Sequence, residues 1–290
     1  MLTVQNLDHV YKSGKFRLTV PTAKFDAQGI TAVVGPNGSG KSTLLSFLSG
    51  LARPRQGVVR YGTKDCFSSF EAIKRDIQLL SWDVQLYDEA TGAEHIQLLR
   101  RLFKGWDQQL ETELAQEFNL PIDQPVEKLS RGENVKLKLI LTMCRKPKVI
   151  LVDEILNDLD TESRRAVYKR LDRYSFENES LVFVATNILT DVERYANEIV
   201  LLSKGVLRLK ENLDSLKERH RRLALRRSTS ATPGNPSVVH HRWIEWDGSS
   251  GTLVTDDYTD SVEATLRDLG IESSPVPHPL EDILSIYGDI

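Results

Sequence analysis

The sequence predicts an α/β fold in which helices cover both faces of a parallel β-sheet. One observation is a glycine-rich loop between an apolar strand and an amphipathic helix, close to residue 40. Another is a wholly apolar run that ends in two acids, at 149–154, and a third is the alternation of apolar runs with helical stretches from there to residue 202. Strands that alternate with helices form a parallel sheet, because each crossover returns the chain to the same end of the sheet.

The glycine-rich loop fits the pattern G-x-x-x-x-G-K-[ST] and consists of Gly35, Pro36, Asn37, Gly38, Ser39, Gly40, Lys41, Ser42 and Thr43. Glycines let successive backbone N–H groups turn toward phosphate oxygens, and the following helix adds the positive end of its dipole. Lys41 supplies a full charge at the β and γ phosphates, and the Ser42 hydroxyl is placed to bind Mg²⁺. A chance glycine turn is the alternative, but it leaves the flanking strand and helix unexplained. The segment therefore predicts a nucleotide-binding site.

The apolar run at 149–152 leads directly into Asp153 and Glu154. A buried strand of a parallel sheet places its C-terminal tip at the ligand crevice. In a phosphate-loop protein Asp153 would hold Mg²⁺, and Glu154 would take a proton from an attacking water. Acids that end a strand are also common on protein surfaces, so it is their combination with the loop that favours a catalytic site.

Composition narrows the class of protein. The chain has 290 residues with 40% hydrophobic and 27% charged residues, which is typical of a globular protein. The formal charge of −3 gives no reason to expect a nucleic-acid partner. The two cysteines, Cys66 and Cys144, are far apart, which favours a reducing compartment. No apolar run approaches the ~18 residues of a membrane helix.

Two helical stripes, at 96–103 and 110–118, predict a helical subdomain over about residues 86–145. Other strand-like runs stand at 2–4, 16–20, 30–34, 58–61, 181–186 and 199–202, and other helical stretches at 162–174 and 191–196. These elements complete a first domain over residues 1–210.

The composition changes after residue 205. Residues 212–227 are predicted to form a helix with a basic end, followed by a flexible linker to residue 237, so that 211–237 separates two domains. The basic end is interpreted as a solvated helix face, with contact to lipid headgroups or to an acidic partner as the alternative. Strand-like and helical pieces within 238–290 predict a small α+β accessory domain.

A further motif is Leu129-Ser130-Arg131-Gly132-Glu133, just before a predicted helix. It resembles the LSGGQ segment of ATP-binding cassette (ABC) proteins, from which Arg131 and Glu133 depart. With the loop and the acidic strand, residues 1–210 resemble the ATP-binding subunit of an ABC transporter. The resemblance implies a phosphate-loop ATPase of ABC type that binds ATP and Mg²⁺, with an antiparallel β subdomain, a helical subdomain and a C-terminal accessory domain.

In that family two ATP-binding domains pack head to tail, and each ATP lies between the phosphate loop of one subunit and the LSGGQ segment of the other. The resemblance therefore implies that Ser130 and Gly132 complete the site of a partner ATPase, in a homodimer or a heterodimer. It implies that Tyr11 stacks on adenine, with a half-buried aromatic as the alternative, and that Asp160 lies in the loop that crosses the interface. It also implies a separate transmembrane permease subunit and a cytoplasmic location, peripheral on the inner face of the cell membrane.

Two positions depart from the family pattern. The glutamine that binds Mg²⁺ falls at Trp82, whose indole cannot coordinate a cation, so Gln85 is the candidate substitute. The switch histidine, counted with the catalytic residues, falls at Asn187, which can hydrogen-bond a γ-phosphate but cannot carry a proton. These departures predict an ATP site that binds well and hydrolyses slowly or asymmetrically, with ordinary turnover as the alternative.

The tail at 279–283 and the separate ATPase chain are most similar to exporter ATPases, so export is the expected direction. Two rivals stand beside this prediction. One is an ABC ATPase that acts on ribosomes or DNA, which the acidic net charge disfavours. The other is a regulatory subunit that senses ATP and hardly hydrolyses it.

Overall fold

A computed structural model describes residues 1–11, 16–26, 28–227 and 243–288. The chain forms two compact units, Met1–Lys210 and Glu211–Gly288. Among the described residues, no helix is both long and apolar enough to span a lipid bilayer.

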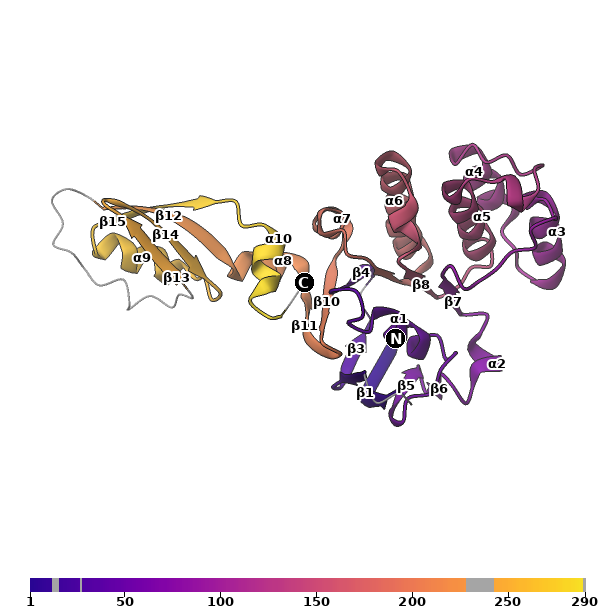
Figure 1. The fold of residues 1–290 in the computed structure, drawn as a ribbon, viewed down its shortest axis with the longest axis horizontal. Coiled ribbons are helices and arrows are strands. Elements are labelled where there is room, and N and C mark those ends of the chain that lie inside the picture. The colour runs from indigo at the N-terminus through magenta and orange to yellow at the C-terminus, as the bar shows by residue number, and fades with distance from the viewer. Residues whose placement is uncertain (12–15, 27, 228–242, 289–290) are drawn as a thin grey trace. The chain divides into compact units, whose positions relative to one another are not determined.

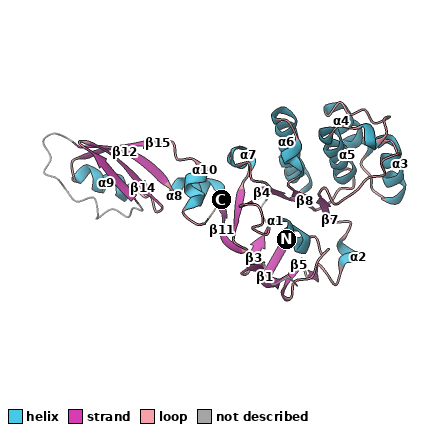
Figure 2. Cartoon of the chain, viewed as in Figure 1, coloured by secondary structure: helices cyan, strands magenta, loops and turns pink. Residues whose placement is uncertain are grey.

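The first unit is built on one mixed β-sheet (Figures 1 and 2). In the described part of the chain, its strands follow the order β6 (Lys64–Asp65), β5 (Gln56–Tyr61), β1 (Leu2–Val10), β2 (Arg17–Val20), β11 (Val206–Asn212), β10 (Glu198–Ser203), β4 (Gly29–Val34), β9 (Leu181–Ala185), β8 (Val149–Asp153) and β7 (Ile77–Leu80). Strands β10 to β7 pair in parallel. Strand β1 pairs antiparallel with β2, β5 and β3 (Ala23–Phe25). The predicted α/β class with an antiparallel subdomain is confirmed.

The parallel strands are buried on both faces, which explains their nearly continuous apolar sequences. All residues of β4 and β9 are buried. Successive side chains of a strand point to opposite faces. In β8, accordingly, Ile150 and Val152 belong to one hydrophobic cluster, whereas Val149 and Leu151 belong to the other.

Helices and short turns join these strands. They are α1 (Lys41–Leu48), α2 (Phe70–Ile73), α3 (Gly92–Leu102), α4 (Gln108–Glu117), η1 (Val126–Lys128), α5 (Arg131–Met143), η2 (Ile155–Asp158), α6 (Thr161–Asn178) and α7 (Leu189–Tyr195), where η marks a 3₁₀ turn. The predicted helical subdomain corresponds to α3, α4 and α5.

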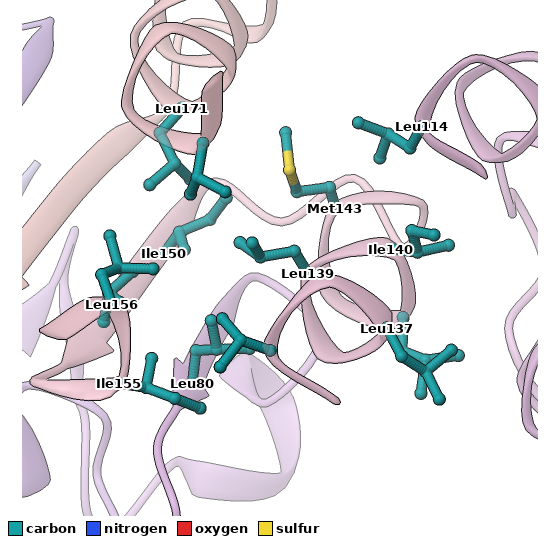
Figure 3. Packing of buried hydrophobic residues seen from close by; sticks show 14 of the residues in the cluster. Leu80, Leu114, Leu137, Leu139, Ile140, Met143, Ile150, Ile155, Leu156 and Leu171 are labelled. Carbon is teal, nitrogen blue, oxygen red and sulfur yellow. The ribbon is translucent and has the colours of Figure 1, made fainter. Parts of the chain in front are cut away.

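Helix α5 joins the helical subdomain to the sheet. Its apolar side chains lie among those of α4, α6, β7, β8 and η2, as Figure 3 shows for Leu80, Leu114, Leu137, Leu139, Ile140, Met143, Ile150, Ile155, Leu156 and Leu171. Leu139 is fully buried, so shortening it to alanine would cost about 2–5 kcal/mol of stability. Tight packing of this kind keeps α5 in a defined place beside the sheet.

The second unit is a small α+β structure. It contains α8 (Leu213–Arg219), β12 (Arg221–Arg227), β13 (Trp243–Asp247), β14 (Ser250–Thr255), α9 (Asp260–Asp268), β15 (Ile271–Val276) and α10 (Leu280–Ser285). The sheet order is β13-β14-β12-β15. Leu223, Leu225 and Leu253 of the sheet pack with Val262 and Leu266 of α9.

The helix predicted over 212–227 is wrong in its second half, because α8 ends at Arg219 and the chain continues as strand β12. In β12 the buried Leu223 and Leu225 alternate with more exposed residues, which is the period of a half-buried strand. The many arginines conceal this alternation. Residues 211–227 therefore belong to the second unit, and the linker predicted over 228–237 lies outside the described residues.

Candidate functional site

The phosphate loop lies between β4 and α1 and is shaped by two glycines. Gly35 has a φ of +146°, and a Cβ atom there would lie 2.0 Å from the carbonyl oxygen of Leu202. Gly40 has a φ of +106°, and its Cβ would lie 2.9 Å from the ring of Phe16. Any other residue at either position would need an unfavourable backbone conformation and a displaced neighbour. The curl of the loop therefore depends on glycine at these positions.

A hollow of about 500 Å³ opens over the loop. It is lined by Tyr11, Phe16, Asn37, Gly38, Gly40, Lys41, Ser42, Thr43 and Glu154. Its size falls within the range of small-molecule sites. Gly35 and Pro36 do not line it and instead present their carbonyl oxygens to Lys41. Ser39 is buried and does not line it either.

Lys41 is held by three oxygen atoms. Its residue is only 3% exposed, and Nζ donates to the carbonyl oxygens of Gly35 at 2.8 Å and Pro36 at 3.2 Å. Nζ also lies 2.9 Å from Oε1 of Glu154. A buried ammonium group needs such partners because its removal from water is costly. A phosphate that enters the hollow must therefore compete with Glu154 for Lys41.

Ser42 and Asp153 form a pair of oxygen ligands beside the loop. The Ser42 hydroxyl donates to Oδ1 of Asp153 at 3.0 Å. Burial raises the pKa of Asp153 above its usual range, the Ser42 hydrogen bond lowers it, and the charge of Glu154 raises it further. Mg²⁺ prefers hard oxygen ligands, and its charge would offset the buried negative charge. The pair therefore fits a Mg²⁺ ion.

The acids reach the loop because three parallel strands end at the same level. Asp153 is in register with Ala185 of β9, and Ala185 is in register with Val33 of β4. The chain turns sharply after β8: Glu154 has a φ of +53°, and its N–H donates to the Ala185 carbonyl at 3.1 Å. A left-handed φ costs a non-glycine residue ~1–2 kcal/mol, which the surrounding strands compensate.

Asn187 lies just beyond the end of β9, at the same edge of the sheet. It is exposed and does not line the hollow. Its Oδ1 accepts from Nδ2 of Asn157 at 3.4 Å, and Oδ1 of Asn157 accepts from the Thr186 hydroxyl at 3.1 Å. An amide held in this way leaves the Nδ2 donors of Asn187 available for other acceptors.

Tyr11 stands at the rim of the hollow. The residue is 43% exposed, and its hydroxyl lies 2.9 Å from Oγ1 of Thr43. The ring of His9 meets it edge-on at 5.0 Å. An exposed aromatic ring fixed beside a phosphate loop offers a surface on which a purine base can stack.

Ser130 and Glu133 form a capping box at the start of α5. The N–H of Glu133 donates to the Ser130 hydroxyl oxygen at 3.2 Å, and the N–H of Ser130 donates to the Glu133 carboxylate at 2.8 Å. The hydrogen bonds from Ser130 hold the pKa of Glu133 below its usual range. Asp160 caps α6 in a similar way, accepting from the N–H of Ser163 at 2.9 Å. Ser130, Gly132 and Asp160 do not line the hollow of their own chain.

The structure does not bring Gln85 to the Ser42–Asp153 pair. Gln85 is exposed and lines a different hollow, between α3 and α5. Trp82 is turned toward η2, where its Nε1 donates to Oδ2 of Asp158 at 2.9 Å. That the Trp82 indole is unsuited to metal binding could be predicted from the sequence. Its contact with Asp158 could not.

Three residues near the site were not found from the sequence. Phe16 lines the hollow beside Tyr11, and the signal for it was an aromatic residue a few positions after Tyr11 in the sequence. Asn157 and Asp158 lie in η2, which begins directly after Glu154. Polar residues directly after a catalytic strand were a signal for the last two, although their partners lie far away in sequence.

These features define a class of protein: a phosphate loop, an acid-ended strand beside it and a helical subdomain are the parts of a phosphate-loop ATPase. Residues 18–157 match the family described as ABC transporter. TTE0246 of Caldanaerobacter subterraneus, an ABC transporter ATP-binding protein, is 30% identical over 187 residues, 59% of this chain and 75% of that protein. The chain belongs to the ABC transporter family of ATP-binding proteins.

Two further relatives show how far the similarity extends. The tungstate uptake system ATP-binding protein TupC of Peptoclostridium acidaminophilum is 29% identical over 208 residues, 70% of this chain and 95% of TupC. The cassette MJ0796, solved as a dimer in a post-hydrolysis state with ADP and Pi, has a TM-score of 0.64 at 21% identity, over 73% of this chain and 99% of that one. The predicted ABC-type fold and ATPase class are confirmed. Export is not established, because TupC is named for uptake.

Proposed function

We propose that this chain hydrolyses ATP as one of two paired ATPase subunits and drives a separate membrane-spanning subunit. The observation that carries the proposal is the convergence of Lys41 and Ser42, at the start of α1, with Asp153 and Glu154, at the end of β8. Replacing Lys41 by alanine should abolish tight ATP binding in a nucleotide titration. Unchanged affinity would contradict the assignment of the hollow.

Each of these side chains has a role in the proposed reaction. The loop amides and Lys41 bind the phosphates, and Ser42 with Asp153 would hold Mg²⁺. The ion, when bound, would supply positive charge to the phosphates. Glu154 accepts a proton from the attacking water once its contact with Lys41 is released, because a free carboxylate is the better acceptor.

The proposed pairing is supported by the position of the Ser130–Gly132 segment. The Ser130 hydroxyl donates to the Glu133 carboxylate at 2.7 Å, so a phosphate would have to displace that contact to reach the hydroxyl and the first helix N–H groups of α5. The segment does not line its own chain's hollow. A head-to-tail pair would place it over the nucleotide of a second subunit, and MJ0796 was solved as a dimer. Size-exclusion chromatography of Glu154→Gln should show a dimer with ATP and a monomer without it. A monomer under both conditions would count against pairing.

A further hollow, beside β7 and the end of α3, supports a membrane partner. It has about 470 Å³ and an apolar lining that includes Leu102 and Phe103, with the three cations Lys74, Arg75 and Arg145 and no carboxylate among its described lining residues. Nε of Arg145 is buried without a hydrogen-bond partner in the described chain, and burial lowers the pKa of this residue to about 10. These features fit an amphipathic helix that carries an acid.

The test of this contact is a charge placed in the hollow. Leu102 is 60% exposed, and Leu102→Asp should prevent co-purification of the membrane subunit from detergent-solubilised membranes. Phe176→Asp is the control, because Phe176 is 50% exposed but lies on α6. Equal recovery of the membrane subunit with both variants would place the contact elsewhere. Through such a contact the chain would be cytoplasmic and peripheral at the inner face of the membrane.

The rate and direction of the cycle are further parts of the proposal. Slow hydrolysis is supported by Trp82, which binds Asp158, and by Gln85, which lies in another hollow. Turnover measured with and without the membrane subunit separates a slow ATPase from an ATP-sensing regulatory subunit. Export is supported by the similarity of the 279–283 tail to exporter ATPases, and a flux assay in vesicles of known orientation decides it.

A further inference from the structure

We propose that Asp158 is a positioning residue that holds the Ser130–Gly132 segment against the catalytic core of its own chain. The inference rests on the proposed function, because it is there that this segment serves the nucleotide of a second subunit. Asp158 is the last residue of η2, shortly after the proposed base Glu154. Its contacts were not expected from any motif.

The carboxylate of Asp158 joins two distant segments. Its Oδ2 accepts from Nε1 of Trp82 at 2.9 Å, and its Oδ1 lies 3.4 Å from Nη1 of Arg131. Trp82 belongs to the segment that follows β7, and Arg131 is the first residue of α5. One side chain therefore links the loop after β7, the turn after β8 and the start of the helical segment that contains Ser130.

Other contacts hold the same three segments together. Nζ of Lys138, on α5, lies 4.8 Å from the centre of the Trp82 ring and donates to the carbonyl oxygen of Ser81 at 3.2 Å. A Cβ atom on Gly132 would lie 3.5 Å from the side chain of Leu159, which is ordinary van der Waals contact. The start of α5 thus lies close to the residue after Asp158, and the carboxylate determines how it is turned.

The exposure of the partners argues for orientation rather than for stability. The Arg131 side chain is 80% exposed and that of Asp158 is 32% exposed, so their ion pair adds little to the folding free energy. The buried residues of α5, such as Leu137 and Leu139, hold the helix in any case. What depends on Asp158 is the direction in which the first turn of α5 presents Ser130 and its N–H groups.

Three variants test this inference. Asp158→Ala removes both contacts, whereas Asp158→Asn keeps an acceptor for the Trp82 indole and loses only the charge toward Arg131. Glu177→Ala is the matched control, because it breaks an exposed ion pair with Arg173 on α6, remote from the segment. For each, we measure amide hydrogen exchange at 131–135 in the nucleotide-free chain, kcat and KM for ATP, and the unfolding midpoint.

For Asp158→Ala we expect exchange at 131–135 to rise ~tenfold and kcat to fall ~tenfold, the effect of losing one hydrogen bond to a charged group. KM should stay within about twofold because the chain's own phosphate loop is intact. Asp158→Asn should lose less than the alanine variant, and Glu177→Ala should change nothing.

Unchanged exchange and kcat in Asp158→Ala would overturn the inference. The inference would also be overturned if both Asp158 variants lost the same fraction of kcat and both had a lower unfolding midpoint. That is the behaviour of a merely structural residue. An inactive wild-type chain would instead contradict the proposed function, and the exchange measurement would still decide whether Asp158 holds the segment.

Discussion

Replacing Glu154 by glutamine should tighten nucleotide binding while it stops hydrolysis. Oε1 of Glu154 lies 2.9 Å from the buried Nζ of Lys41. The incoming phosphate must displace this carboxylate and also meets its negative charge. Glutamine removes the repulsion and leaves Lys41 more weakly held, so both effects favour the bound state.

The magnitude follows from the geometry of the pair. A hydrogen bond between charged groups contributes ~1.5–3 kcal/mol when it is shielded from water. The Glu154 side chain is 38% exposed, so solvent screening reduces this to ~1 kcal/mol or slightly more. Since ~1.4 kcal/mol corresponds to a tenfold change in affinity, Kd should fall about five- to tenfold. Loss of the general base should lower kcat ~10²–10⁴-fold.

The assay is calorimetric titration with ADP, whose β-phosphate reaches Lys41 and which lacks the γ-phosphate needed for the proposed dimer closure. Glu113→Gln is the matched control. The carboxylate of Glu113 lies 2.9 Å from Arg170, whose side chain is only 8% exposed, while that of Glu113 is 45% exposed. An unchanged or weaker ADP affinity in Glu154→Gln, or the same gain in Glu113→Gln, would refute the reasoning.

Three other predictions concern single residues. Lys41→Ala should weaken ATP binding by at least ~100-fold in the same titration, because the phosphates lose a full charge in a buried site; a tenfold loss or less would be inconsistent with this. The raised pKa of Asp153 means that its carboxylate takes up a proton at higher pH than an ordinary aspartate. The Mg²⁺ concentration for half-maximal ATPase should therefore increase as the pH falls toward 5, and an unchanged requirement would exclude Asp153 as a ligand. Arg219→Ala should destabilise the second unit by ~1–3 kcal/mol, since the guanidinium donates to Glu211 at 2.7 and 2.9 Å and to the Tyr287 hydroxyl at 2.7 Å. Hydrogen exchange of β12 in the full chain measures this, with Arg267→Ala on α9 as the control.

The acidity of Asp153 also affects stability. Its pKa is higher in the folded chain than in the unfolded chain, so the folded state binds the proton more readily. The charged carboxylate therefore destabilises the fold above its folded pKa, and this cost disappears as the pH falls below its unfolded pKa.

The elements with strong local patterns could be predicted from the sequence. The phosphate loop, β8 and β9 are marked by glycine spacing or by unbroken apolar runs, and in the structure Lys41, Ser42 and Glu154 line one hollow. Local patterns suffice here because a parallel sheet aligns the ends of its strands.

What could not be predicted depends on partners that are distant in the chain. Nothing near Trp82 indicates that its indole binds Asp158, because that contact exists only when β7 and β8 lie side by side. Strand β12 was missed because arginines occupy its exposed positions, so that the alternation of leucines looks like a charged helix face. Strand β15 contains Pro275, which argues against a strand in general but is tolerated at the edge of a sheet, where β15 lies.

The common level at which β4, β8 and β9 end has a consequence for how such a chain can change. Inserting or deleting one residue within β8 would rotate Asp153 to the opposite face of the sheet. The same change in the connection between α6 and β9 would leave the alignment of the strand tips intact. The number of residues in each strand is therefore as strictly constrained as the identity of the acid at its end. The connections between helices and strands, by contrast, are free to lengthen.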